Sequence, residues 1–318
     1  MRLLLSREAK LFDSELFIFK VFVSILTGYV LFHNHSIIGK DMISVLFGIM
    51  LSLEPVSVSG FKSGLGQIEA SIIGGSISAI IIYFGGINYI TVPLAVALTV
   101  YFTLIMDFRN LSIIAIFTSI YMTQYVQLNE MNEVSVLLTF RLRMLAVISG
   151  VIIAVSYNYI FSKLFYKKLA KKRTIYLFEK LISNFKGFLD KNLKLDLLKT
   201  VITDTFIDAD LIRNNIIDLE KENKNSKVLK NYNEIVLRLR NINHYLMDII
   251  LNDETINGNE IENVIDILKK QVELLENSEK SFKYSENDES DNNNTNKINI
   301  AVKIIVNNVK EVTSGSDN

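Results

Sequence analysis

The chain has 318 residues, of which 49% are hydrophobic, and its 34 basic and 34 acidic side chains give a formal net charge of +0. A mean hydropathy of +0.28 is too high for an ordinary soluble protein of this length, so it indicates a membrane protein. Because the chain contains no cysteine, a disulfide framework, a thiolate zinc site and a cysteine nucleophile are excluded.

The first half of the chain contains about six apolar segments, each of which is predicted to form a membrane-spanning helix. They cover residues 16–32, 42–53, 68–84, 87–106, 111–126 and 144–161. The second segment is too short to cross a bilayer unless residues 54–56 continue it, and Pro55 is expected to end or kink its helix. Short joints rich in Gly, Asn and Asp predict helical hairpins.

Basic residues beside the spans predict the orientation, because they are retained on the cytoplasmic side. Six of them directly follow the last span: Lys163, Lys167, Lys168, Lys171, Lys172 and Arg173. An even number of spans then places both termini in the cytoplasm of a multi-pass protein of the inner (cell) membrane, in agreement with Arg2, Arg7 and Lys10. Arg141 and Arg143 fall toward the outside, against the rule.

The second half of the chain has the pattern of soluble amphipathic helices. Such stretches cover residues 175–189, 197–222, 228–251 and 260–275, which predicts a small antiparallel helical bundle. The expected organisation is an all-α protein with a transmembrane domain at 1–163 and a cytoplasmic helical domain at 164–283. A disordered linker at 284–297 and an amphipathic tail at 298–318 complete the prediction.

The third and sixth spans align on glycine, because Gln67 precedes Gly74 and Arg143 precedes Gly150 by the same seven residues. Three spans in each half would make two inverted repeats, an arrangement common in transporters. Gly74, Gly75 and Gly150 are also explained as small residues that allow membrane helices to pack closely.

Two segments of the membrane half resemble the aromatic acid exporter family of the fusaric acid resistance superfamily. The first contains Ser52-Leu53-Glu54-Pro55, Lys62-Ser63-Gly64-Leu65 and Ile73-Gly74, and the second contains Arg143, Ile148-Ser149-Gly150 and Asn158. The C-terminal half is similar to the cytoplasmic domain of the short members. The resemblance implies export of small aromatic carboxylic acids. The chain departs from the family pattern at Gln67, where arginine is expected, at Ala70, where glycine is expected, and at Ala146, where an acidic residue is frequent.

Five residues are candidates for transport chemistry. Arg143 is expected to bind an anionic substrate, because a guanidinium presents a planar set of donors to a carboxylate. Gln67 and Lys62 are the corresponding candidates toward the inner side. Glu54 and Glu69 are candidates for proton coupling, although Glu54 at a solvated interface and Glu69 at a solvated helix end, or paired with Lys62, are open alternatives.

These features predict a secondary transporter that exports small organic anions as a homodimer or higher homo-oligomer in the lipid bilayer. The chain has no phosphate-binding glycine loop and no nucleophile elbow, so neither an enzyme nor a cofactor is expected. A passive anion channel of the same superfamily and a membrane-anchored scaffold are the alternatives. The basic residues 167–173 adjoin a span, so lipid contact is expected there and nucleic acid is not a predicted partner.

Overall fold

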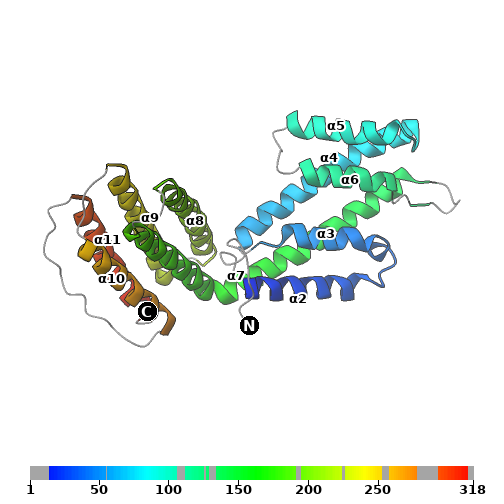
Figure 1. Cartoon of the computed structure of the whole chain (residues 1–318). Coiled ribbons are helices and arrows are strands. Elements are labelled where there is room, and N and C mark those ends of the chain that lie inside the picture. The colour runs from blue at the N-terminus through cyan, green and yellow to red at the C-terminus, as the bar shows by residue number, and fades with distance from the viewer. Residues whose placement is uncertain are drawn as a thin grey trace. The chain divides into compact units, whose positions relative to one another are not determined.

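The structure is a computed structural model of the chain and describes residues 14–54, 56–105, 112–124, 127–128, 134–190, 195–223, 226–252, 258–277 and 293–313. In these residues all regular structure is helical, apart from an isolated β-bridge between Leu128 and Val134, which confirms the all-α prediction. Two compact units are present (Figure 1). One is Leu16–Ser162, which we call the apolar unit. The other contains the described residues before Leu16 and those from Lys163 onward, and we call its helices the helical bundle.

The helices of the apolar unit follow one another with short connections. They are α2 (Ser14–Phe32), the 3₁₀ turn η1 (Ile38–Asp41), α3 (Met42–Ser52), α4 (Ser57–Gly85), α5 (Thr91–Ile105), α6 (Ser112–Gln124) and the first part of α7 (Val136–Leu189). Within the described residues, α2, α4 and α7 are long and apolar enough to cross a membrane, whereas α5 and α6 are shorter apolar helices. The 11 residues of α3 extend only about 16 Å, roughly half of a hydrocarbon core.

The helix of the second predicted span ends before Glu54, so that residue does not lengthen the span. Helix α3 ends at Ser52, Leu53 is extended, and α4 begins at Ser57. The physical reason is the proline in the sequence: the residue before a proline is disfavoured in the helical region, and Glu54 holds that position. Pro55 itself lies outside the described residues.

Helix α7 is continuous over 54 residues, although its apolar part and its amphipathic part were expected as separate helices at 144–161 and 175–189. The intervening residues 162–174 contain no glycine or proline and are rich in lysine, which favours the helix. Nothing in the local sequence therefore interrupts the helical hydrogen bonding where the apolar segment ends.

The apolar unit hides polar side chains and exposes large apolar ones. Phe22 is 63% exposed and Phe84 is 83% exposed, while Lys20, Asp41 and Arg143 are buried. A protein in water rarely exposes so many large apolar side chains, because their transfer out of water is the main driving force of folding. The distribution is the one expected where lipid surrounds the helices.

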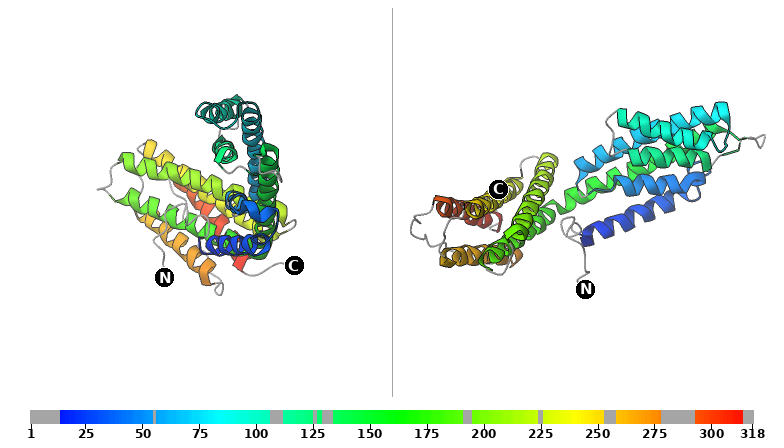
Figure 2. Two further views of the ribbon diagram at one scale, coloured as in Figure 1. Left: turned by 90° about the vertical axis from the view of Figure 1, so that its right-hand side faces the viewer. Right: turned by 45° about the horizontal axis from the view of Figure 1, so that its top comes forward.

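The helical bundle contains the last part of α7 and four further helices (Figure 2): α8 (Leu195–Glu222), α9 (Lys227–Leu251), α10 (Gly258–Asn277) and α11 (Asn293–Thr313). Helix α9 contacts α8 and α11, and α10 contacts α11. Each amphipathic stretch predicted from the sequence lies in one of these helices.

The C-terminal amphipathic segment is an integral part of the bundle. Ile298, Val302, Ile305 and Val309 return to one face of α11 and are buried. Helix α11 begins at Asn293, so residues 293–297 of the predicted linker are helical, because α11 packs on α9 and a helix, once formed, extends at low cost. The remainder of that linker lies outside the described residues.

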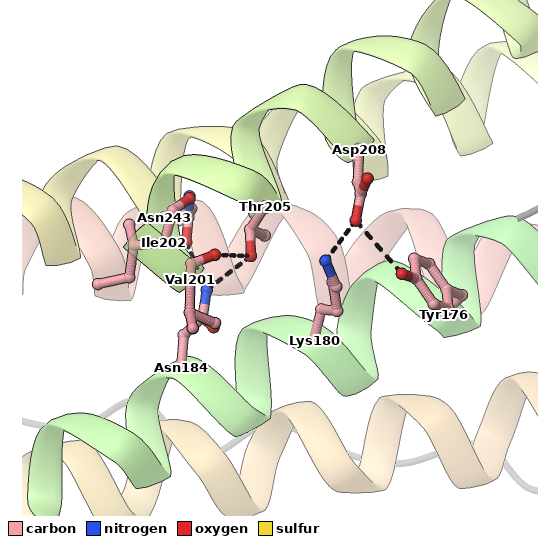
Figure 3. A network of polar contacts seen from close by, with 8 residues as sticks. All are labelled: Tyr176, Lys180, Asn184, Val201, Ile202, Thr205, Asp208 and Asn243. Carbon is pink, nitrogen blue, oxygen red and sulfur yellow. Dashed lines mark hydrogen bonds and ion pairs between the residues drawn. The ribbon is translucent and has the colours of Figure 1, made fainter. Parts of the chain in front are cut away.

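Buried polar side chains connect α7 to α8 inside the bundle (Figure 3). The carboxylate of Asp208 on α8 forms an ion pair with Lys180 of α7 and accepts a hydrogen bond of 3.3 Å from the Tyr176 hydroxyl. The side chain of Asp208 is 6% exposed and that of Lys180 is 19% exposed. This ion pair is therefore largely removed from water, and loss of either partner would leave the other charge buried without a counter-charge.

A second group of hydrogen bonds in the same network reaches α9 (Figure 3). The Asn184 amide on α7 donates to the Thr205 hydroxyl at 2.9 Å and to the Asn243 carbonyl oxygen at 3.0 Å. Asn243 in turn donates to the backbone carbonyl of Ile202 at 3.0 Å. Three helices are thus held in one register by amide groups that cannot be satisfied if the helices slide.

We expect Asp208→Ala to destabilise the bundle by about 3 kcal/mol, because it leaves the Lys180 ammonium largely buried without its carboxylate. Hydrogen exchange of the full-length protein measures this as amide exchange about 100-fold faster in α7 and α8. Asp210→Ala is the matched control, since Asp210 lies on the same helix as Asp208 and pairs with Arg240 of α9 but is half exposed. Its loss is expected to cost under about 1 kcal/mol. Equal exchange rates in the two variants would contradict the prediction.

Candidate functional site

Four polar side chains from different elements meet inside the apolar unit, and we call them the arginine cluster. They are Asp41 of η1, Ser44 of α3, Tyr121 of α6 and Arg143 of α7. Asp41 is 3% exposed and Arg143 is 4% exposed. Opposite charges are thus buried together among apolar helices, where an ionisable residue is costly and usually functional.

Asp41 has a local structural reason for its position, because it caps the N-terminus of α3. Its Oδ1 accepts a hydrogen bond of 3.1 Å from the backbone N–H of Ser44, which otherwise has no partner within the helix. The Ser44 hydroxyl donates to Oδ2, and the Tyr121 hydroxyl donates to Oδ1. Three donors therefore hold the carboxylate at this end of α3.

Arg143 reaches the same place from α7. Its Nη1 donates to the Ser44 hydroxyl oxygen, and its Cζ lies 3.9 Å from the centre of the Tyr121 ring, a distance typical of a cation–π contact. The Ser44 hydroxyl therefore links Arg143 to Asp41, accepting from one and donating to the other. The Nε of Arg143 is buried and has no hydrogen-bond partner. Such a donor costs about 1–3 kcal/mol when unpaired and is a position that an incoming acceptor would satisfy.

Helix α3 ends inside the apolar unit, so its last carbonyl groups require partners from other helices. Asn158 of α7 donates to the carbonyl of Ser52 at 2.8 Å and accepts from the backbone N–H of Glu54 at 3.2 Å. The buried ammonium of Lys20 on α2 donates to the carbonyl of Glu54. Lys20 therefore stabilises the break between α3 and α4.

Gln67, one of the predicted substrate ligands, serves the same end of α3. It is 2% exposed, its Oε1 accepts from the Ser52 hydroxyl at 2.7 Å, and its Nε2 donates to the carbonyl of Phe47 at 3.2 Å. Because both the oxygen and the nitrogen of its amide are hydrogen-bonded to α3, Gln67 satisfies polar groups near the end of that helix. Arg143 lies in the arginine cluster, bonded to Ser44 nearer the start of α3.

The other predicted residues lie apart from Arg143. Lys62 and Glu69 are exposed on α4, and in the described part of the chain no ion pair joins them. Glu54 is half-buried in the break between α3 and α4, where its backbone groups make the contacts given above. The structure thus brings Glu54 and Gln67 to the end of α3, and leaves Lys62 and Glu69 at the surface.

The glycines predicted for helix packing lie at close contacts between helices. A Cβ on Gly150 of α7 would lie 2.2 Å from the carbonyl oxygen of Val45 and 2.9 Å from Cα of Gly48, both on α3. A Cβ on Gly74 of α4 would lie 2.1 Å from the carbonyl oxygen of Ala115 on α6. At both crossings the neighbouring atoms are backbone atoms, which cannot rotate away.

Two glycine contacts between α4 and α7 are related to each other by the alignment of these two helices. A Cβ on Gly64 would lie 2.7 Å from Val151, and a Cβ on Gly75 would lie 2.8 Å from Phe140. In the glycine alignment of the two spans, Gly64 corresponds to Phe140 and Gly75 corresponds to Val151. Exchanging the two helices therefore converts one contact into the other.

Three members of the arginine cluster were not identified from the sequence. Asp41 had a recognisable signal, since an acidic residue directly before an apolar helical run is a preferred N-cap. Ser44 and Tyr121 had none, because Ser and Tyr occur throughout the apolar segments. Tyr121 and Asp41 are 80 residues apart, and only the packing of α6 brings them together.

A scan against family models finds no match to the chain, and a search of curated proteins finds no significant similarity. The likeness to the aromatic acid exporter family therefore depends on the segments quoted from the sequence.

Proposed function

We propose that this protein is a secondary transporter of the inner membrane that exports small organic anions, with aromatic carboxylic acids as the expected class. The observation that carries the proposal is the buried guanidinium of Arg143, which has one N–H without a partner. Arginine binds carboxylates through a planar set of donors, and it keeps its charge even when buried. The positive charge of this guanidinium and its unpartnered N–H favour an anion over a cation at this position.

The proposal includes two inverted repeats, α2 to α4 and α5 to α7. Two observations support it. The contacts of Gly64 and Gly75 exchange under the alignment of α4 with α7. Gly74 of the first half packs on α6 of the second half, and Gly150 of the second half packs on α3 of the first. Binding sites of such transporters lie between the repeats, and the arginine cluster joins α3 to α6 and α7.

Six spans, two cytoplasmic termini and a homodimer or higher oligomer belong to the same proposal. Helices α5 and α6 have 15 and 13 residues, or about 20 Å, which is less than the hydrocarbon thickness. Oligomerisation is one way in which short apolar helices avoid contact with a thicker bilayer. The lysines that follow Ser162 are expected to contact anionic lipid at the cytoplasmic surface.

The test is efflux of labelled 4-hydroxybenzoate from preloaded cells that express the protein or carry an empty vector. We expect faster efflux of the acid, and no difference for 4-hydroxybenzamide, which has the same shape without the charge. Efflux against the concentration gradient of 4-hydroxybenzoate supports a coupled exporter. Efflux only down that concentration gradient supports a passive anion channel. Equal efflux with and without the protein would refute the transport proposal and favour a membrane-anchored scaffold.

A further inference from the structure

The arginine cluster contains the carboxylate of Asp41, which would repel an anion that binds to Arg143. Asp41 and Arg143 have opposite charges, so the buried cluster is neutral as a whole. No hydrogen bond of the cluster joins a carboxylate oxygen of Asp41 directly to the guanidinium of Arg143. The Ser44 hydroxyl lies between them, bonded to Oδ2 of Asp41 on one side and to Nη1 of Arg143 on the other.

A substrate carboxylate that binds Arg143 would replace Ser44 as the acceptor and would also reach the unpartnered Nε. It would then bring a second negative charge next to Asp41, at a place where Asp41 and Arg143 are both almost completely buried. Two carboxylates that share such a site do not both stay ionised, because the repulsion between them is poorly screened. One of them takes up a proton.

Among the protein side chains around the site, Asp41 is the carboxylate that can accept this proton. Helix α3 carries no other titratable side chain, and α6 contributes only Tyr121, whose hydroxyl already donates to Asp41. On α7, Arg143 is the charged member of the cluster, and Arg141 is exposed. Lys40, which adjoins Asp41 in η1, is also exposed.

We infer that Asp41 is the proton-binding counter-ion of Arg143, so that an organic anion and one proton bind to the arginine cluster together. The inference rests on the proposed function, because it assumes that Arg143 binds the anion. The proton comes from water and forms an O–H bond on the Asp41 carboxyl group, Arg143 stays charged, and the net charge of the cluster does not change. Asp41 then replaces Glu54 and Glu69 as the coupling residue, since neither of these contacts Arg143.

Calorimetric titration of the purified full-length protein with 4-hydroxybenzoate tests the inference. Titrations at pH 7.5 in two buffers of different ionisation enthalpy measure how many protons are taken up with each anion. We expect the wild type to take up about one proton per anion, and its affinity to fall about tenfold for each unit of pH rise. Asp41→Asn keeps the size of the side chain and removes its charge. It is expected to take up no proton, to bind independently of pH, and to bind at least about tenfold more tightly at pH 7.5.

Glu69→Gln is the matched control, and it should retain the proton uptake of the wild type, because Glu69 is exposed on α4. Anion binding by the wild type without proton uptake would overturn the inference and leave the proposed function intact. Proton uptake that persists in Asp41→Asn would overturn it as well. If the wild type binds neither 4-hydroxybenzoate nor benzoate, the proposed function fails and the inference falls with it. The wild-type titration is decisive even if Asp41→Asn does not fold.

Discussion

Replacing Arg143 by alanine is expected to reduce efflux of 4-hydroxybenzoate by about 100-fold or more, to the level of cells without the protein. The substitution removes the only charged donor of the arginine cluster, and loss of one partner from a buried charge pair costs about 2–5 kcal/mol. Arg143→Lys should retain part of the activity, because it keeps the charge but loses the planar set of donors. Efflux is measured per amount of protein in the membrane.

The same substitution also affects stability, so the transport result needs a control for folding. Arg143→Ala leaves the buried carboxylate of Asp41 without a counter-charge, which costs about 3 kcal/mol or more. Removing both charges, in Asp41→Asn with Arg143→Ala, is expected to recover most of that stability without recovering efflux. Arg141→Ala is the matched control on the same helix, because Arg141 is exposed. Undiminished efflux in Arg143→Ala would show that Arg143 is not in the anion path.

The second large effect is expected at the crossing of α3 and α7. Gly150→Val places a branched side chain where Cβ alone would lie 2.2 Å from the carbonyl oxygen of Val45, so the two helices have to move apart. Overpacking of this kind costs typically 1–3 kcal/mol, and we expect about 3 kcal/mol or more because the obstructing atoms belong to the backbone. The separation also disturbs the arginine cluster, which needs α3 and α7 in contact.

The measurement is thermal stability in detergent, followed by size-exclusion chromatography of a fluorescent fusion of the full-length protein. Gly150→Val is expected to lower the midpoint by more than about 5 °C and to reduce the amount of folded protein. Ser149→Val is the matched control, since Ser149 is the adjacent residue and its hydroxyl donates only along its own helix, to Leu145. A Gly150→Val variant as stable as Ser149→Val would show that the crossing is not tightly packed.

The start of α4 shows a limit of prediction from local sequence pattern. The apolar run predicted a helix from residue 68, whereas α4 begins at Ser57. Residues 57–67 contain three glycines, which disfavour an isolated helix. In the folded protein two of them allow close packing, since a Cβ on Gly60 would lie 1.9 Å from Asn158, and Gly64 lies against Val151. Tertiary packing therefore offsets a weak local preference, which no reading of the segment alone could reveal.

The predicted site shows the same limit. Arg143 was identified because a charge near an apolar segment is conspicuous in the sequence. Gln67 was chosen because it matches Arg143 in the glycine alignment, yet in the structure its amide satisfies the end of α3. Equivalent positions in two repeats need not carry equivalent chemistry, because each side chain responds to the groups that its own helix meets.

By itself, the sequence determined that the protein is all-α, with an apolar first half and an amphipathic second half. These properties follow from hydrophobic periodicity, which acts over a few residues and is visible in the chain. Only the tertiary structure decided which polar groups meet. Ser44 and Arg143 are 99 residues apart, and they come into contact because Gly48 and Gly150 let α3 and α7 approach to backbone distance. Such contacts depend on how helices pack, and packing is a property of surfaces that many separate segments create together.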